Sequence, residues 1–168
     1  DGYGGAYTYR SGNPCLMEVY RLSKKKWASE LSGKGAALKG ARWNSPGTEI
    51  IYTASNRSLA MAEVAVHLTL ATLPDDYMMV TISIPDDVST ITVKEKDLPR
   101  CWNTFPYLPV TQTLGDNFIR ENKYCLLKIP SAVTKGDFNI LINPFHPDFS
   151  RIRIKSIEPF PFDKRIFK

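Results

Sequence analysis

Residues 40–65 read GARWNSPGTEIIYTASNRSLAMAEVA and pass from a loop through a strand into a helix. The glycines and the proline of the loop are typical of turns, and the β-branched and aromatic residues after Glu49 are typical of a strand. Ser55 is placed to cap a helix over residues 56–72, which Pro74 would stop. Apolar residues lie on nearly every side of that helix, so we expect it to be the central buried helix of the fold.

Three side chains of this stretch are candidates for chemistry. Arg42 lies among small residues beside Trp43, so its guanidinium can meet a phosphate or a carboxylate in a fixed plane. Tyr52 lies on the strand, and Glu63 lies within the apolar helix, where an unpaired carboxylate is costly. Glu63 could pair with His67 one turn further on, or it could stabilise developing positive charge at the rim of a cleft. The residues alone leave both readings open.

For Arg42 and Tyr52, and for three further polar or aromatic residues, a purely structural role is also open. The guanidinium group of Arg42 could bond the main-chain carbonyl groups of its own glycine-rich loop, and Arg21 could have the same kind of structural role. Tyr52 could be a core tyrosine whose hydroxyl is hydrogen-bonded internally, and Trp43 could serve packing alone. Ser131 follows a proline, as a turn cap does, and no base lies beside it in the sequence to make it a nucleophile.

The rest of the chain contains more predicted strands than helices. We predict strands over residues 18–22, 50–53, 77–84, 90–93, 125–129, 139–142 and 151–157, a brief helix or turn over 24–31, and a short helix over 113–122. A turn at residues 85–87 would join two of the strands, glycines mark a loop over 33–40, and prolines and aromatics predict a covering loop over 94–111. Because long crossover helices are missing between most strands, we predict an α+β fold with a mixed, largely antiparallel sheet.

Length and composition predict one compact domain, over residues 17–168. Residues 1–16 are polar, aromatic and turn-rich, which suggests a flexible leader or an expression remnant before Met17. No apolar run approaches the roughly 18 residues that a membrane span needs. The net charge of +5 favours an anionic ligand. We expect no direct nucleic-acid binding, because the basic residues are not interleaved with exposed aromatics in a recognisable reading module.

Cysteine, histidine and glycine patterns exclude several other classes of site. The three cysteines, Cys15, Cys101 and Cys125, show no paired spacing, so we expect a reducing compartment such as the cytoplasm. With His67 and His146 as the only histidines, a zinc site would need scattered ligands, and we expect no metal. The glycine spacing in residues 33–40 matches neither a dinucleotide fingerprint nor a P-loop.

Six ordered blocks of the sequence resemble the RES domain family, which is named for its Arg, Glu and Ser. The blocks are residues 20–22, 40–47 and 51–55, Leu59-Ala60 with Glu63, residues 129–131, and Asn139 with Ile142-Asn143-Pro144 and His146-Pro147. They span residues 17–167. Members of this family resemble ADP-ribosyltransferase toxins in fold, act in bacteria as the toxin beside an Xre-like, DNA-binding antitoxin, and degrade NAD.

The resemblance implies a role for each candidate residue. It implies catalytic roles for Glu63, Arg42 and Tyr52, and an NAD site lined by Arg21, Arg42, Trp43 and Tyr52, with secondary contacts from Ser131 and Asn143. NAD would be the substrate, and no cofactor would be needed.

The chemistry of NAD cleavage suits a site with one carboxylate. Breaking the bond between nicotinamide and ribose expels a neutral base and leaves an oxocarbenium-like sugar, which one fixed carboxylate can stabilise. Two arginines could hold the pyrophosphate, and an aromatic ring could stack on the leaving base. We expect a glycohydrolase or a phosphorolytic enzyme that destroys NAD. A protein mono-ADP-ribosyltransferase is the first alternative, and a non-catalytic binding module is the second.

Overall fold

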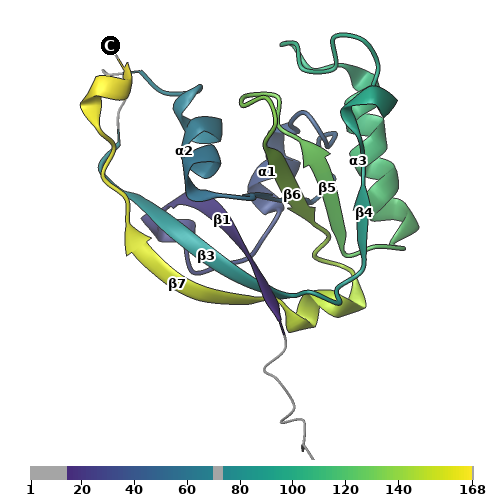
Figure 1. Ribbon diagram of the computed structural model, residues 1–168, viewed down its shortest axis with the longest axis horizontal. Coiled ribbons are helices and arrows are strands. Elements are labelled where there is room, and N and C mark those ends of the chain that lie inside the picture. Colours follow the sequence, from purple (N-terminus) through teal and green to yellow (C-terminus); the bar gives the residue numbers. More distant parts are fainter. Residues whose placement is uncertain (1–14, 70–73, 168) are drawn as a thin grey trace, which may run out of the picture.

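The computed structural model describes residues 15–69 and 74–167, which form one twisted sheet with helices on it (Figure 1). The strands are β1 (Leu16–Lys24), β2 (Ile51–Ala54), β3 (Tyr77–Pro85), β4 (Thr90–Thr92), β5 (Leu126–Pro130), β6 (Phe138–Ile142) and β7 (Arg153–Pro159). Their order in the sheet is β4-β5-β6-β2-β1-β3-β7. Within these described ranges, β4 and β5 are the one parallel pair, so the predicted α+β class with a largely antiparallel sheet is confirmed.

Three α-helices and several short 3-10 turns complete the described part of the chain. The helices are α1 (Lys34–Lys39), α2 (Arg57–Ala65) and α3 (Pro109–Glu121). The 3-10 turns are η1 (Lys25–Trp27), η3 (Glu95–Asp97), η4 (Pro147–Arg151) and η5 (Lys164–Phe167). None of the helices in residues 15–69 and 74–167 has the length and apolar character needed to cross a membrane.

The sheet is weakly joined at its middle. β1 pairs with β3 along its whole length, from Leu16 opposite Pro85 to Lys24 opposite Tyr77. Between β1 and β2, by contrast, the register holds a single pair, Tyr20 opposite Ala54. The sheet therefore consists of two well-paired parts, β7-β3-β1 and β2-β6-β5-β4, which diverge on either side of that pair.

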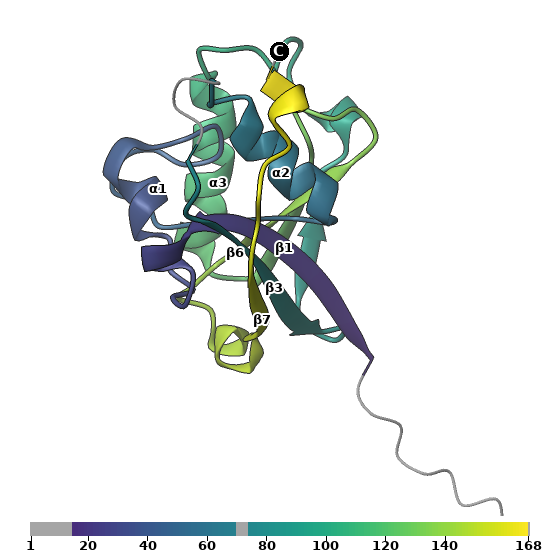
Figure 2. The ribbon, with the colours of Figure 1, turned by 90° about the vertical axis from the view of Figure 1, so that its left-hand side faces the viewer.

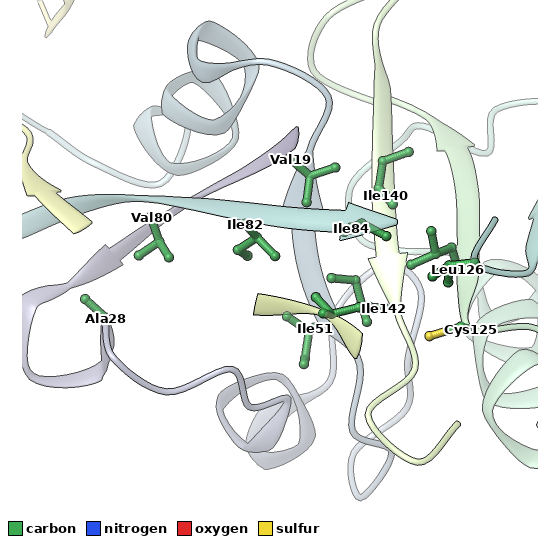
Figure 3. Close-up of a cluster of buried hydrophobic side chains, with 12 residues drawn as sticks. Val19, Ala28, Ile51, Val80, Ile82, Ile84, Cys125, Leu126, Ile140 and Ile142 are labelled. Atoms are coloured by element: carbon green, nitrogen blue, oxygen red, sulfur yellow. The ribbon is translucent and has the colours of Figure 1, made fainter. Parts of the chain in front are cut away.

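Of the three apolar clusters among the described residues, two contain residues from both parts of the sheet and hold them together. The largest joins Val19, Val80, Ile82 and Ile84 of β1 and β3 to Ile51, Leu126, Ile140 and Ile142 of β2, β5 and β6 (Figure 3). Alternate residues of β5 and β6, among them Leu127, Ile129 and Leu141, lie on the opposite face of the sheet. They pack with Phe118 of α3 and with Trp43 and Trp102, which lie in two loops. Both faces of these strands are therefore buried, which explains why their sequences are apolar without strict alternation.

The helix α2 covers one end of the sheet and is shorter than the sequence predicted. Its cap is Asn56, not Ser55, because the Asn56 side chain accepts a hydrogen bond from the main-chain N–H of Leu59 at 2.8 Å. The helix ends at Ala65, and Val66 is 58% exposed. Residues 70–72 of the predicted helix lie outside the described residues. The expectation of a central buried helix is wrong: its apolar character comes largely from alanines, and only two of its residues, Leu59 and Ala60, are buried.

The chain after β7 returns to α2. Phe160 and Phe162 pack against the cluster formed by Leu22, Leu59 and Met79. Figures 1 and 2 both show this C-terminal segment beside α2. The segment thus supports the face of α2 that turns toward β1 and β3.

The strands on either side of the turn at 85–87 do not pair with each other, because β4 lies at the far edge of the sheet and pairs with β5. Two further expectations differ from the structure. Residues 34–39 form α1, where glycines had predicted a loop. The predicted leader, residues 1–16, overlaps β1 at Leu16, and its residues 1–14 lie outside the described part.

Candidate active site

A cavity of about 720 Å³ opens where β1 and β2 diverge. Its walls come from the middle of β1, from β2, from α2 and from the loop that carries Arg42. The covering loop before α3 adds Phe105 and Tyr107, and the end of the sheet adds Ala132, Val133 and Asn139. Segments that are far apart in the sequence therefore meet around one space that can hold a ligand.

Glu63 projects from α2 into this cavity and is held from the opposite side. Its Oε1 accepts a hydrogen bond from Nδ2 of Asn139 at 2.6 Å and another from Oγ of Ser131 at 2.9 Å. No described residue donates a hydrogen bond to Oε2. No described side chain has a buried polar atom without a partner, so Oε2 is accessible, and Glu63 lines the cavity. The pairing with His67 that the sequence allowed is not formed, although His67 lines the same cavity.

Ser131 supports Glu63 and does not itself line the cavity. It is buried just beyond the end of β5, and its Oγ accepts hydrogen bonds from the main-chain N–H groups of Val133 and Thr134, both at 3.0 Å. Because the hydroxyl has one proton and both N–H groups donate to its oxygen, that proton points to Glu63. The tight turn after β5 thus fixes the direction in which Ser131 donates.

Arg42 links its own loop to the covering loop. Its Nη1 donates to the carbonyl oxygens of Trp102 at 2.7 Å and Thr104 at 2.9 Å, and its guanidinium lies 5.0 Å from the ring centre of Tyr107. Burial lowers the pKa of Arg42, and Tyr107 and the Glu63 carboxylate oppose that shift. The structural role expected for Arg42 is therefore present, but it uses the carbonyls of a distant loop. One nitrogen makes both hydrogen bonds, so the other guanidinium nitrogens have no acceptor among the described residues, and Arg42 lines the cavity.

Arg21 supplies a second cation from the middle of β1. Its Nη1 donates to the carbonyl oxygen of Ser32 at 3.2 Å, and burial lowers its pKa. Its remaining guanidinium nitrogens have no acceptor among the described residues, and Arg21 lines the cavity. Two guanidinium groups and one carboxylate therefore share the space, so the walls are suited to a ligand with anionic groups beside a cationic one.

Tyr52 and Trp43 line the same cavity as Arg42. The Tyr52 hydroxyl donates to Oδ1 of Asn44 at 2.7 Å and accepts from the main-chain N–H of Trp43 at 3.1 Å. Burial raises the pKa of Tyr52 well above its usual range. The hydroxyl is thus hydrogen-bonded internally, as the structural reading expected, while the ring still lines the cavity. Trp43 is 3% exposed and packs 5.8 Å from the ring centre of Trp102.

Asn143 is not brought to the cavity. It is fully buried, donates from Nδ2 to Oδ1 of Asn122 at 2.9 Å, and accepts at Oδ1 from the main-chain N–H of Phe145 at 2.9 Å. Both ends of its amide are therefore used in joining the end of α3 to the segment after β6. The structure assigns Asn143 a packing role, in place of the ligand contact that the resemblance implied.

Sequence reasoning missed two features of the site. Asn139 was noticed only as part of a sequence block, although a polar residue inside an apolar strand is a signal in its own right. Phe105 and Tyr107 were assigned to a covering loop without a role. Their rings pack edge to face at 5.2 Å, and Phe105 is 77% exposed. The available signal in the sequence was two aromatic residues flanking Pro106 in a segment without regular periodicity.

Possible metal ligands are scattered in the described part of the chain. Across residues 15–69 and 74–167, no group of three or more His, Cys, Asp or Glu side chains is placed to hold an ion. Glu63 is the one carboxylate among the residues that line the cavity, and the groups that bond it are an amide and a hydroxyl.

Comparison with known proteins gives consistent matches. The family model described as the RES domain matches residues 18–163. The Prs ADP-ribosylating toxin of Sphingobium sp. is 36% identical over 143 residues, which cover 84% of this chain and 89% of that protein. Toxin Res of Pseudomonas putida is 34% identical over 158 residues, covering 90% and 100%. A chain from the crystal structure of the M. tuberculosis MbcT–MbcA toxin–antitoxin complex superposes with a TM-score of 0.68 at 19% identity, covering 88% and 85%, which shows a shared fold.

Proposed function

Because the chain belongs to the RES domain family, we propose that it is the toxin of a toxin–antitoxin pair and destroys NAD by cleaving the bond between nicotinamide and ribose. The observation that carries the proposal is the way in which hydrogen bonds are distributed over the two carboxylate oxygens of Glu63. One of its oxygens is held by two donors, and the other is open to a cavity that also contains Arg21 and Arg42. This arrangement matches the charge pattern of NAD, which has a cationic nicotinamide ribose and an anionic pyrophosphate.

The reaction needs the site to stabilise positive charge on the sugar. As the bond to nicotinamide breaks, its electrons leave with the ring, which becomes neutral, and the ribose becomes an oxocarbenium-like cation. Both hydrogen bonds to the Glu63 carboxylate use Oε1, so Oε2 is the oxygen that would face this cation in the cavity. A preorganised carboxylate in a partly buried cavity stabilises such charge more than water does, because it need not reorient during the reaction.

The two arginines would hold the substrate while the bond breaks. A pyrophosphate offers oxygens to the free guanidinium nitrogens of Arg21 and Arg42, and the planar fork suits such oxygens better than an ammonium does. The rings of Tyr52 and Trp43, which line the cavity, would pack against the substrate. No protonation of the leaving group is required, because nicotinamide leaves as a neutral molecule.

The acceptor of the ADP-ribosyl group distinguishes the candidate activities. Water would give a glycohydrolase, and inorganic phosphate would give a phosphorolytic enzyme. A protein side chain would give a mono-ADP-ribosyltransferase, which the name of the Sphingobium relative favours as the second candidate. All three share the bond cleavage at Glu63 and differ in what enters from the open side of the cavity.

The proposed partner is an Xre-like antitoxin protein. Two observations support it: membership of the RES domain family, and a fold shared with a chain that was crystallised in a toxin–antitoxin complex. Co-expression with the neighbouring gene product should relieve toxicity, and toxicity that persists under co-expression would contradict this pairing.

The activity test uses purified protein and NAD. We expect release of free nicotinamide, together with ADP-ribose in phosphate-free buffer or a phosphorylated ADP-ribose when phosphate is present. Adding a cell extract with labelled NAD would reveal any labelled protein acceptor. NAD that stays intact under all three conditions would contradict the proposal and support a binding module without catalytic activity.

A further inference from the structure

We infer that Asn139 is a positioning residue: its amide donor locks the Glu63 carboxylate so that Oε2, and not Oε1, faces the substrate. This inference rests on the proposed function, because it concerns how Glu63 acts in the same cavity. The sequence alone indicated no such role for Asn139.

The main chain of Asn139 is fixed from both sides. It lies on β6 opposite Ala54 of β2 and opposite Ile129 of β5, in the better-paired part of the sheet. The residue is 9% exposed, so its side chain has little freedom. Glu63, by contrast, lies on α2, which is anchored mainly through Leu59 and Ala60. The rigid partner in this pair is Asn139, and the long carboxylate side chain is the part that needs to be held.

The chemistry of the contact fixes which end of the amide faces Glu63. An ionised carboxylate accepts hydrogen bonds only, so the amide must present Nδ2, which lies 2.6 Å from Oε1. Ser131 donates to the same oxygen at 2.9 Å. Two hydrogen bonds to the same oxygen, from two different side chains, fix the orientation of the carboxylate. Oε1 is then occupied, and Oε2 is presented to the cavity.

Removing the amide leaves Ser131 as the remaining donor to the carboxylate, which can then rotate about that single contact. Misplacement of a reacting group by about 1 Å can reduce a rate by about 100-fold. Asn139→Ala should therefore lower kcat for NAD cleavage by about 100-fold, with a change in KM of less than about threefold. The KM is expected to be nearly constant because the free nitrogens of Arg21 and Arg42 are unaffected.

A double-mutant cycle separates positioning from a general structural role. In the Glu63→Gln background the carboxylate is already lost, so adding Asn139→Ala should reduce the residual rate by less than about twofold. A residue that merely supports the fold would reduce both backgrounds by the same factor. The matched control is Thr111→Ala, which removes a different buried hydrogen bond, from Oγ to the carbonyl of Leu108, on α3 and outside the cavity. It should lower the melting temperature and leave kcat unchanged.

Exchanging the carboxylate and the amide between positions 63 and 139 adds a readout that does not depend on turnover. Asn139→Asp alone places two carboxylates in contact and should lower the melting temperature. The double variant Glu63→Gln with Asn139→Asp exchanges amide and carboxylate, so the amide then at position 63 can donate to the carboxylate then at position 139, and the repulsion is removed. It should melt above Asn139→Asp and below the wild type, because the amide nitrogen cannot accept the hydrogen bond from Ser131, and it should stay inactive. A double variant that melts no higher than Asn139→Asp would overturn the proposed contact.

The outcomes for the two proposals are distinct. Wild-type protein that leaves NAD intact would overturn the proposed function, and this inference with it. Wild-type protein that cleaves NAD, with kcat unchanged in Asn139→Ala or with equal losses in both backgrounds, would overturn this inference alone.

Discussion

The hydroxyl of Tyr52 connects the strand β2 to the loop that carries Arg42. It makes two internal hydrogen bonds, with Asn44 and with the N–H of Trp43. Tyr52→Phe keeps the ring that lines the cavity but leaves two buried polar groups without a partner. We expect a loss of about 1–3 kcal/mol in the free energy of unfolding, measured by urea denaturation. A loss below about 0.5 kcal/mol would show that water replaces the hydroxyl and that the loop does not depend on it.

A substitution of Arg42 tests whether a planar guanidinium group is needed beside Glu63. Arg42→Lys keeps the charge but cannot stack on Tyr107 and hold two carbonyls while presenting further nitrogens to a ligand. We expect KM for NAD to rise by about tenfold, which corresponds to about 1.4 kcal/mol. Steady-state kinetics and thermal melting of the same sample give the two readouts. A large fall in melting temperature with unchanged KM would assign Arg42 to structure alone.

For single residues, the sequence predicted which residues belong to the site better than it predicted the groups to which they are hydrogen-bonded. Arg21, Arg42, Tyr52 and Glu63 were all identified, and the structure brings all four to one cavity. What each of them bonds was not predictable, because the partners lie 8 to 76 residues away along the chain. The contact of Asn139 with Glu63 follows from sheet register, which no local pattern specifies.

The helix α3 shows how close packing of an element fixes the site. Gly115 lies against the loop of Arg42, and a Cβ added there would lie 1.7 Å from the carbonyl oxygen of Trp43. Gly115→Ala must therefore separate α3 from that loop. We expect a loss of at least about 3 kcal/mol in unfolding free energy, within the range for overpacked and strained sites. NAD turnover should fall as well, because the loop that carries Arg42 moves.

The matched control for this prediction is Gly35→Ala on α1. A Cβ at Gly35 would meet no atom within 4 Å, so the substitution should be neutral or stabilise by up to about 1 kcal/mol through helix propensity. Equal effects of the two substitutions on urea denaturation would contradict the packing that the structure describes for α3.

The sequence predicted which segments form strands and which form helices, but it did not predict every strand pairing or every end of an element. The strands appear within a few residues of their predicted bounds, since alternation and β-branched residues are local signals. The partner of β4 was missed, because the choice between β3 and β5 depends on contacts across the whole sheet. The end of α2 was missed because an alanine-rich sequence continues the helical pattern past Ala65 without showing which residues are buried.

The alkaline stability of the whole molecule depends partly on Cys125, which lies in the largest apolar cluster. Burial raises the pKa of its thiol from the usual 9.0 to about 12. Above pH 9 the unfolded chain loses this proton while the folded chain keeps it, so unfolding becomes easier as pH rises. The free energy of unfolding should fall between about pH 9 and 12 by up to about 1.4 kcal/mol per pH unit from this group.

The comparison that isolates this effect is the pH slope of Cys125→Ala. Lysines and tyrosines titrate in the same range in both proteins, so the difference between the two slopes belongs to the thiol. The variant should be less stable near neutral pH but should lose less stability between about pH 9 and 12. Parallel curves for the two proteins would contradict a raised pKa at Cys125.

For the whole molecule, the six sequence blocks predicted the family, and the matches to known proteins confirm it. Most of the blocks contribute residues to the walls of the opening between β1 and β2, which explains how separate short motifs can belong to one site. The opening itself was not predictable, because it arises from a ladder that stops after one residue pair.

The most direct test measures free nicotinamide released from NAD by the purified wild-type protein and by Glu63→Gln at equal concentrations. The substitution keeps the size of the side chain and an oxygen that can accept from Ser131 and Asn139, so the variant should stay folded. We expect steady release by the wild type and a loss of at least about 100-fold in the variant, in keeping with removal of a preorganised group that stabilises developing charge. Equal release by the two proteins, or no release by the wild type, would contradict the central claim.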